Sequence, residues 1–141
     1  MDNSPTDTTV AVDPSLVSWT KLMYALHGAA IVIGALSPAF IVTAFLFGLP
    51  SIIAVIMNYL KRADAKGTWL ESHFRWQLRT FWIAAAALLA VSLVFGPLSL
   101  ILIGLPFLIG GFVLIGLWAA YRIARGWMSL NDGRALPNGG A

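Results

Sequence analysis

Two long stretches without a charged side chain dominate this sequence. Lys21 and Lys61 enclose the first, which has 39 residues, and Arg79 and Arg122 enclose the second, which has 42. A single helix of the first length would measure about 58 Å, whereas the hydrocarbon layer of a bilayer is about 30 Å thick. Because lipid offers the backbone no hydrogen-bond partner, each stretch is expected to form helices and to reverse near an interface.

The composition points to the same environment. Of the 141 residues 59% are hydrophobic and 11% are charged, whereas an average soluble domain has about 25% charged residues. These values exclude both a soluble globule and a disordered chain. The absence of cysteine excludes a disulfide framework, a thiolate metal site and a cysteine nucleophile.

Prolines mark the expected reversals, because proline lacks an N–H and disfavours helix at the preceding residue. We place the first turn at Pro38 and the second at Gly96-Pro97. A turn at Pro50 is rejected, since too few residues would remain before Lys61 to cross a bilayer, whereas a turn near Pro106 stays open. The four predicted spans run from about Ser18 to Leu36, Ala39 to Leu60, Trp69 to Phe95, and Leu98 to Trp127.

The predicted fold is therefore an all-α integral membrane protein with four transmembrane helices arranged as two hairpins. A four-helix domain would occupy residues 18–130. We expect a flexible polar N-terminal tail over 1–17 and a flexible C-terminal tail over 131–141.

The basic residues predict the orientation. In the four-span arrangement all of them fall on one face, which the positive-inside tendency makes cytoplasmic, so both termini are expected inside. The net charge of +3 is weak support for nucleic-acid binding, and no nucleic-acid partner is expected. The nine basic residues are Lys21, Lys61, Arg62, Lys66, Arg75, Arg79, Arg122, Arg125 and Arg134.

The start of the third span mixes charges, a histidine and aromatic residues. Thr68 and Glu71 have the spacing of a capping box, which predicts a helix start there. In a purely structural interpretation, Glu71 pairs with Arg75 while Arg75 and Arg79 reach toward lipid phosphates. In a functional interpretation, the segment is a binding surface for a protein partner or a lipid head group, built from Glu71, His73, Arg75 and Arg79.

This segment resembles the signature of the Tic-twenty-like family of small bacterial membrane proteins of unknown function, named for a chloroplast protein-import component. The matching positions are Glu71, His73, Arg75 and Leu78. The polar segment from Tyr121 to Arg134 also resembles the family's polar segment after its last helix. The resemblance covers residues 18 to 137. It implies a compact helical protein of the bacterial cytoplasmic (inner) membrane, associated with translocation or assembly.

His27 lies deep in the first predicted span. An intramembrane ionisable side chain is costly and therefore a functional candidate, although a neutral histidine can also bond to a neighbouring helix. Both interpretations stay open.

Two hypotheses for the function follow. The first is a non-enzymatic interaction, assembly or translocation-associated factor whose partners are the bilayer and another membrane protein or a second copy. The alternative is a small oligomeric channel or transporter that uses His27. No phosphate loop, zinc-protease or serine-hydrolase motif occurs, so we expect no catalytic residue, cofactor or metal.

Overall fold

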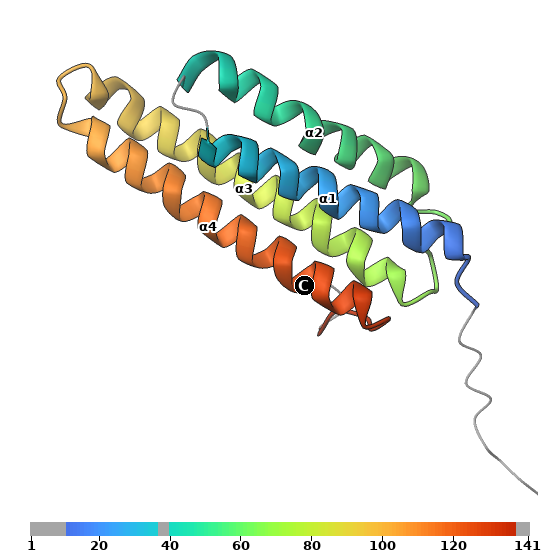
Figure 1. Cartoon of the computed structure of the whole chain (residues 1–141). Helices are drawn as coiled ribbons and strands as arrows, with labels where there is room; N and C mark the ends of the chain where they lie inside the picture. Colours follow the sequence, from blue (N-terminus) through green and yellow to red (C-terminus); the bar gives the residue numbers. More distant parts are fainter. Residues whose placement is uncertain (1–10, 37–39, 138–141) are drawn as a thin grey trace, which may run out of the picture.

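The computed structural model describes residues 11–36 and 40–137, and the regular elements in these ranges are α-helices. The prediction of an all-α protein is therefore confirmed. The described residues form four helices, namely α1 (Pro14–Leu36), α2 (Phe40–Lys61), α3 (Leu70–Ser99) and α4 (Gly104–Asn131) (Figure 1).

Three helical stretches are long and apolar enough to cross a membrane. They are Pro14–Gly34, Leu70–Ser99 and Gly104–Asn131. The stretch Gly48–Lys61 of α2 is a shorter apolar helix. Length and composition thus identify a membrane protein at the coarse level predicted from the uncharged stretches.

Helix α1 begins inside the segment that we expected to be a tail. Asp13 Oδ1 accepts a hydrogen bond from the Ser15 N–H at 2.8 Å, and Pro14 occupies the first helical position, where its missing N–H costs nothing. Hydrogen bonding from the backbone and the side chain of Ser15 holds the pKa of Asp13 below its ordinary value. Residues 1–10 of the predicted tail lie outside the described residues.

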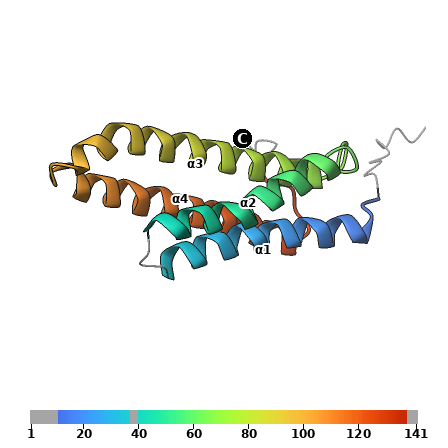
Figure 2. The same ribbon diagram turned by 90° about the horizontal axis from the view of Figure 1, so that it is seen from above.

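Successive helices run in opposite directions (Figure 1). Helix α1 packs along α2 and α3 packs along α4, while α1 and α4 make the largest junction between these two pairs. Figures 1 and 2 show that α3 and α4 continue together beyond the ends of α1 and α2. One end of the bundle therefore contains all four helices, and the other consists of α3 and α4 alone.

The second turn differs from both predicted positions. Helix α3 continues through Pro97 to Ser99, and residues 100–103 make the turn. A Cβ on Gly104 would lie 2.5 Å from the backbone carbon of Leu98, so only glycine allows the chain to return this closely. Pro106 lies in the first turn of α4, where helix N–H groups have no intrahelical partner and proline is tolerated. Gly104 therefore sets the turn, and neither Gly96-Pro97 nor Pro106 does.

In the first uncharged stretch there is no turn at Pro50, as we predicted, because α2 passes through that residue. Membrane helices tolerate such a proline when neighbouring groups satisfy the freed carbonyl. The turn predicted at Pro38 lies outside the described residues.

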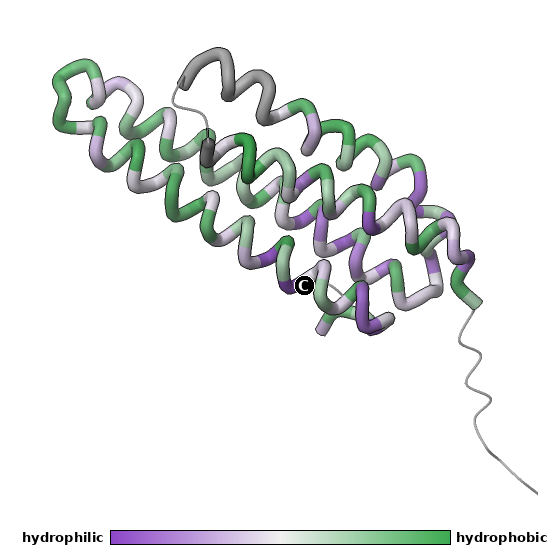
Figure 3. The backbone as a smooth tube through the Cα atoms, viewed as in Figure 1, coloured by the Kyte–Doolittle hydropathy of each residue, from purple (hydrophilic) through white to green (hydrophobic). Residues whose placement is uncertain are grey.

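Buried side chains gather at the end where all four helices meet. The buried residues of α3 all lie between Leu70 and Thr80, whereas further along the bundle Leu93 is 68% exposed and Leu114 of α4 is 69% exposed. Figure 3 shows hydrophilic residues concentrated at the four-helix end and hydrophobic residues over the rest of α3 and α4. The apolar surface suits lipid, and the buried polar side chains of α3 lie at the four-helix end.

Candidate functional site

The first turns of α3 carry the charged residues predicted as a binding surface. Glu71 Oε1 accepts a hydrogen bond from Arg75 Nη2 at 3.0 Å, so the predicted pair is present. Arg79 follows one turn later and is exposed, as Arg75 is. These three residues share one side of α3, which we call the charged face.

The helix start uses the predicted capping residues in a shifted register. Thr68 Oγ1 accepts a hydrogen bond from the Leu70 N–H at 3.2 Å, and Glu71 Oε2 accepts one from the Gly67 N–H at 3.0 Å. Gly67 has a φ of 76°, a conformation that favours glycine. The carboxylate of Glu71 thus fixes the connector as well as pairing with Arg75.

His73 does not belong to the charged face, contrary to our expectation. Its side chain is fully buried, and its Nδ1 lies 3.1 Å from Tyr24 Oη of α1. Its Nε2 lies 2.8 Å from the carbonyl oxygen of Arg134, so the ring bridges α1 and the segment after α4. His73 follows Glu71 by two positions, and residues two apart in an α-helix lie on different sides of it.

The segment after α4 folds back onto the start of α3. Ser72 Oγ accepts a hydrogen bond from the Leu136 N–H at 2.9 Å, and the Leu136 side chain is buried. We expected residues 131–141 to form a flexible tail. Instead, the described part of this segment is held to α3 by the carbonyl of Arg134 and by the N–H and buried side chain of Leu136.

A second buried polar group joins α2 to α3. Asn58 Nδ2 donates to the carbonyl oxygen of Phe74 at 3.1 Å and to Gln77 Oε1 at 3.3 Å. The side chains of Asn58 and Gln77 are almost completely buried. In a low-dielectric interior such bonds fix the relative position of the two helices, because leaving either group unpaired is costly.

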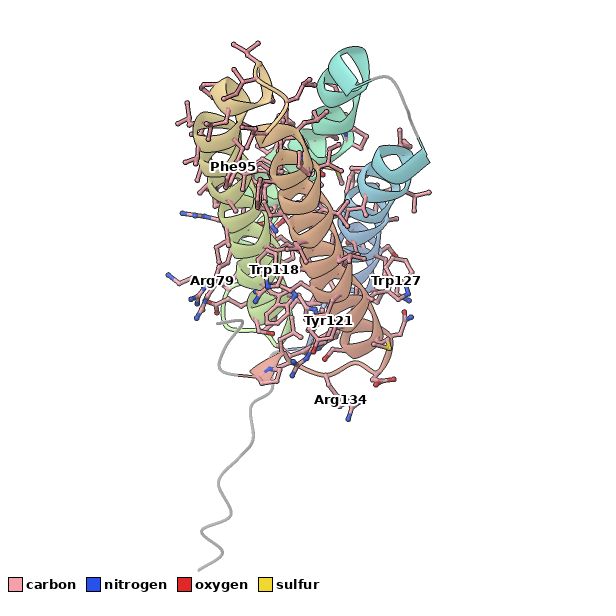
Figure 4. All side chains as sticks on the ribbon, turned by 90° about the vertical axis from the view of Figure 1, so that its left-hand side faces the viewer. Arg79, Phe95, Trp118, Tyr121, Trp127 and Arg134 are labelled. Carbon is pink, nitrogen blue, oxygen red and sulfur yellow. The ribbon has the colours of Figure 1, made fainter. Side chains whose placement is uncertain are left out.

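A third group joins α3 to α4. Trp76 Nε1 donates to the carbonyl oxygen of Arg122 at 2.9 Å, and Arg122 Nε donates to Thr80 Oγ1 at 2.8 Å. The Arg122 guanidinium lies 3.5 Å from the centre of the Trp76 ring, within the range of a cation–π contact. Figure 4 shows the neighbouring Trp118 and Tyr121 at this level of α4.

An open groove lies between the α2–α3 connector and the charged face. Its lining combines side chains of both charge signs with the apolar side chains of Phe74 and Leu78. The groove therefore offers a partner both ion pairs and apolar contact. The residues lining it include Arg62, Lys66, Glu71, Phe74, Arg75 and Leu78.

His27 lies apart from the charged face, where α1 faces α2. Its Nδ1 lies 3.1 Å from Ser51 Oγ, which is the interhelical bond that we considered for it. Its ring also lies near that of Phe81. Its Nε2 is buried and has no partner among the described residues.

Sequence reasoning missed several residues of this polar end. Arg122 was interpreted only as a basic residue that indicates the orientation, and the spacing of His73, Gln77 and Thr80 was not used. Those three recur at helical intervals of four and three and mark the buried side of α3. Helical periodicity could therefore have separated them from Glu71, although it could not have named their partners.

The polar side chains in the interior of this end bond to backbone carbonyls and to one another, whereas Asn58 Oδ1, Gln77 Nε2 and Arg122 Nη2 have no partner among the described residues. Glu71, Arg75 and Arg79 remain at the surface. Within residues 11–36 and 40–137 no group of three histidine or acidic side chains is placed to hold a metal ion. No protein-family model, curated protein or solved structure matches the chain.

Proposed function

We propose that the chain is a four-span integral membrane protein arranged as two hairpins. The length and apolar surface of α1, α3 and α4 support this, as does the alternating direction of the helices. The turn at residues 100–103 contains only apolar side chains, which suits a reversal close to hydrocarbon.

We further propose the bacterial cytoplasmic (inner) membrane, with both termini cytoplasmic. The basic residues Lys21, Lys61, Arg79 and Arg122 support this orientation, because each ends an uncharged stretch at the four-helix end. The resemblance to the Tic-twenty-like family supports the bacterial assignment.

The function that we propose is a non-enzymatic interaction, assembly or translocation-associated factor. Its cytoplasmic charged face would bind another membrane protein or a second copy of the chain. The observation that carries this proposal is the open groove beside Glu71 and Arg75, whose lining combines charges of both signs with apolar side chains. The buried polar side chains bond mainly within the chain, whereas Arg75 and Arg79 of the charged face are exposed to a partner.

The test is copurification in mild detergent with charge-reversed variants. Arg75→Glu with Arg79→Glu is expected to remove a stoichiometric partner while membrane insertion persists. The matched control, Lys21→Glu with Arg134→Glu, makes the same change in net charge at the same end of the bundle and is expected to keep the partner. Retention by both variants, or equal loss from both, would contradict the proposal.

A small oligomeric channel or transporter is the second candidate. The observation that favours it is the buried Nε2 of His27, which lacks a partner within the described part of the chain. An unpaired polar atom in a membrane interior is costly and suggests a transient ligand such as water or an ion. A flux into reconstituted vesicles that His27→Leu abolishes would favour this candidate, and the absence of any flux would remove its support.

A further inference from the structure

Arg122 is held in a fixed position on the side of α4 that packs against α3. Its Nε is bonded to Thr80, and its guanidinium lies against the rings of Trp76 and Trp118, at 3.5 and 5.3 Å from their centres. Its Nη2 is buried and has no acceptor in the described chain. The side chain is thus immobilised while its charge remains without a carboxylate partner.

Two further arginines lie beside it. Arg125 follows on α4 with its guanidinium 6.0 Å from the Trp76 ring, and Arg79 lies across on α3. The positive charges of both act on Arg122. The ion pairs formed within residues 11–36 and 40–137 use Lys61, Arg75 and Arg134, so none neutralises this group. Three neighbouring cations without an anion repel one another, and a bound negative ligand would relieve this repulsion.

The three arginines lie where the apolar surface ends. Arg79 and Arg122 are the residues that close the second uncharged stretch, so in a bilayer they reach the level of the lipid phosphates. Figure 4 shows Arg79, Trp118 and Tyr121 together at this level of the α3–α4 pair. Aromatic rings favour the same interfacial depth.

An apolar track continues from this group along α4. Arg125, Tyr121, Trp118 and Leu114 recur at intervals of three or four residues and therefore share one side of the helix. Leu114 is 69% exposed, and Tyr121 is 60% exposed. A ligand that joins a phosphate to a hydrocarbon chain fits this sequence of charge, aromatic ring and aliphatic surface.

We propose that the exposed Arg79 and Arg125 bind the phosphate of an anionic phospholipid beside the fixed charge of Arg122, and that the acyl chain lies along the Leu114 side of α4. Arg122 and the Trp76 ring form the fixed base of the site. Guanidinium groups suit this ligand because they donate several charge-assisted hydrogen bonds in a planar arrangement. The site lies on the α3–α4 surface. It shares Arg79 with the charged face, but none of its three arginines lines the groove beside Glu71.

The experiment measures retention of phosphatidylglycerol by the purified protein in neutral detergent, using native mass spectrometry over a lipid titration. The unsubstituted chain is expected to retain one phosphatidylglycerol in preference to phosphatidylcholine. Arg79→Gln with Arg125→Gln is expected to weaken retention by about fivefold for each arginine removed, or about 25-fold together. Both side chains are exposed, so the fold is expected to survive.

The matched control, Arg62→Gln with Arg75→Gln, removes two exposed charges from the same end of the bundle and should leave retention unchanged. Equal weakening in both variants would show a general charge effect and overturn the proposal, as would no weakening in either. Single variants Arg79→Gln and Arg75→Gln, one turn apart on α3, repeat the comparison with less perturbation. Displacement of the lipid by inorganic phosphate alone would identify a free-phosphate site and overturn the assignment to lipid. Because no protein partner is present, the result does not depend on the proposed binding function.

Discussion

Substitution of Gly126 by alanine tests the packing that holds the polar end together. A Cβ at this position would lie 2.3 Å from Tyr24 Oη and 2.5 Å from Tyr24 Cε1. Tyr24 is only 1% exposed and therefore has little space in which to move. Any displacement of its ring also disturbs the bond to His73 Nδ1, which spans 3.1 Å.

The expected cost is the balance of three effects. Overpacking a buried contact costs about 1–3 kcal/mol, and weakening the Tyr24–His73 bond adds about 1 kcal/mol. Alanine is a better helix former than glycine by about 1 kcal/mol, which offsets part of this loss. We therefore expect Gly126→Ala to lower the free energy of unfolding by about 1–3 kcal/mol.

Gly116 supplies the matched control on the same helix, because nothing lies within 4 Å of a Cβ built there. Gly116→Ala should leave stability unchanged or raise it by up to about 1 kcal/mol. Unfolding by sodium dodecyl sulfate in mixed micelles, followed by tryptophan fluorescence, compares the two variants. If Gly126→Ala were as stable as Gly116→Ala, the close approach of Tyr24 to α4 would be refuted.

Three further substitutions probe other parts of the bundle. Gly104→Ala brings a Cβ to 2.5 Å from the backbone carbon of Leu98, which cannot move aside as a side chain can, so its thermal midpoint should fall more than that of Gly126→Ala. Ser72→Ala leaves the Leu136 N–H without its 2.9 Å acceptor and should cost about 1–2 kcal/mol, with faster amide exchange after α4; unchanged exchange would count against the fold-back. The lowered pKa of Asp13 implies a contribution to helix stability that is present at neutral pH and is lost as the pH falls through that folded-state pKa. Asp13→Asn should therefore reduce the acid sensitivity of amide exchange in the first turn of α1, and an unaltered pH profile would argue against the cap.

The sequence predicts the helices well because membrane helices are governed by one strong constraint. The uncharged stretches and their lengths determine that each stretch must contain helices and a reversal, and the Glu71–Arg75 pair follows from helical spacing alone. The position of the second turn was not accessible in this way. It depends on how closely Gly104 approaches the backbone of Leu98. This contact exists only in the folded chain and does not follow from the composition.

The polar end was harder to predict for a related reason. His73 lies among charged and aromatic residues in the sequence, and local context made it look exposed. Its burial depends on Tyr24 and on the carbonyl of Arg134, which are 49 and 61 residues away. Periodicity can indicate a buried side of α3, whereas the partners that fill it come from the packing of all four helices.

Cysteine labelling tests the proposed two-hairpin topology most directly, because the chain has no native thiol. Single cysteines replace Ala63 in the α2–α3 connector and Ala135 after α4, and intact bacterial cells are treated with a membrane-impermeant maleimide. The two-hairpin arrangement with both termini cytoplasmic predicts that both positions stay unlabelled until the inner membrane is permeabilised and that both are then labelled. Labelling of one position but not the other in intact cells would contradict it.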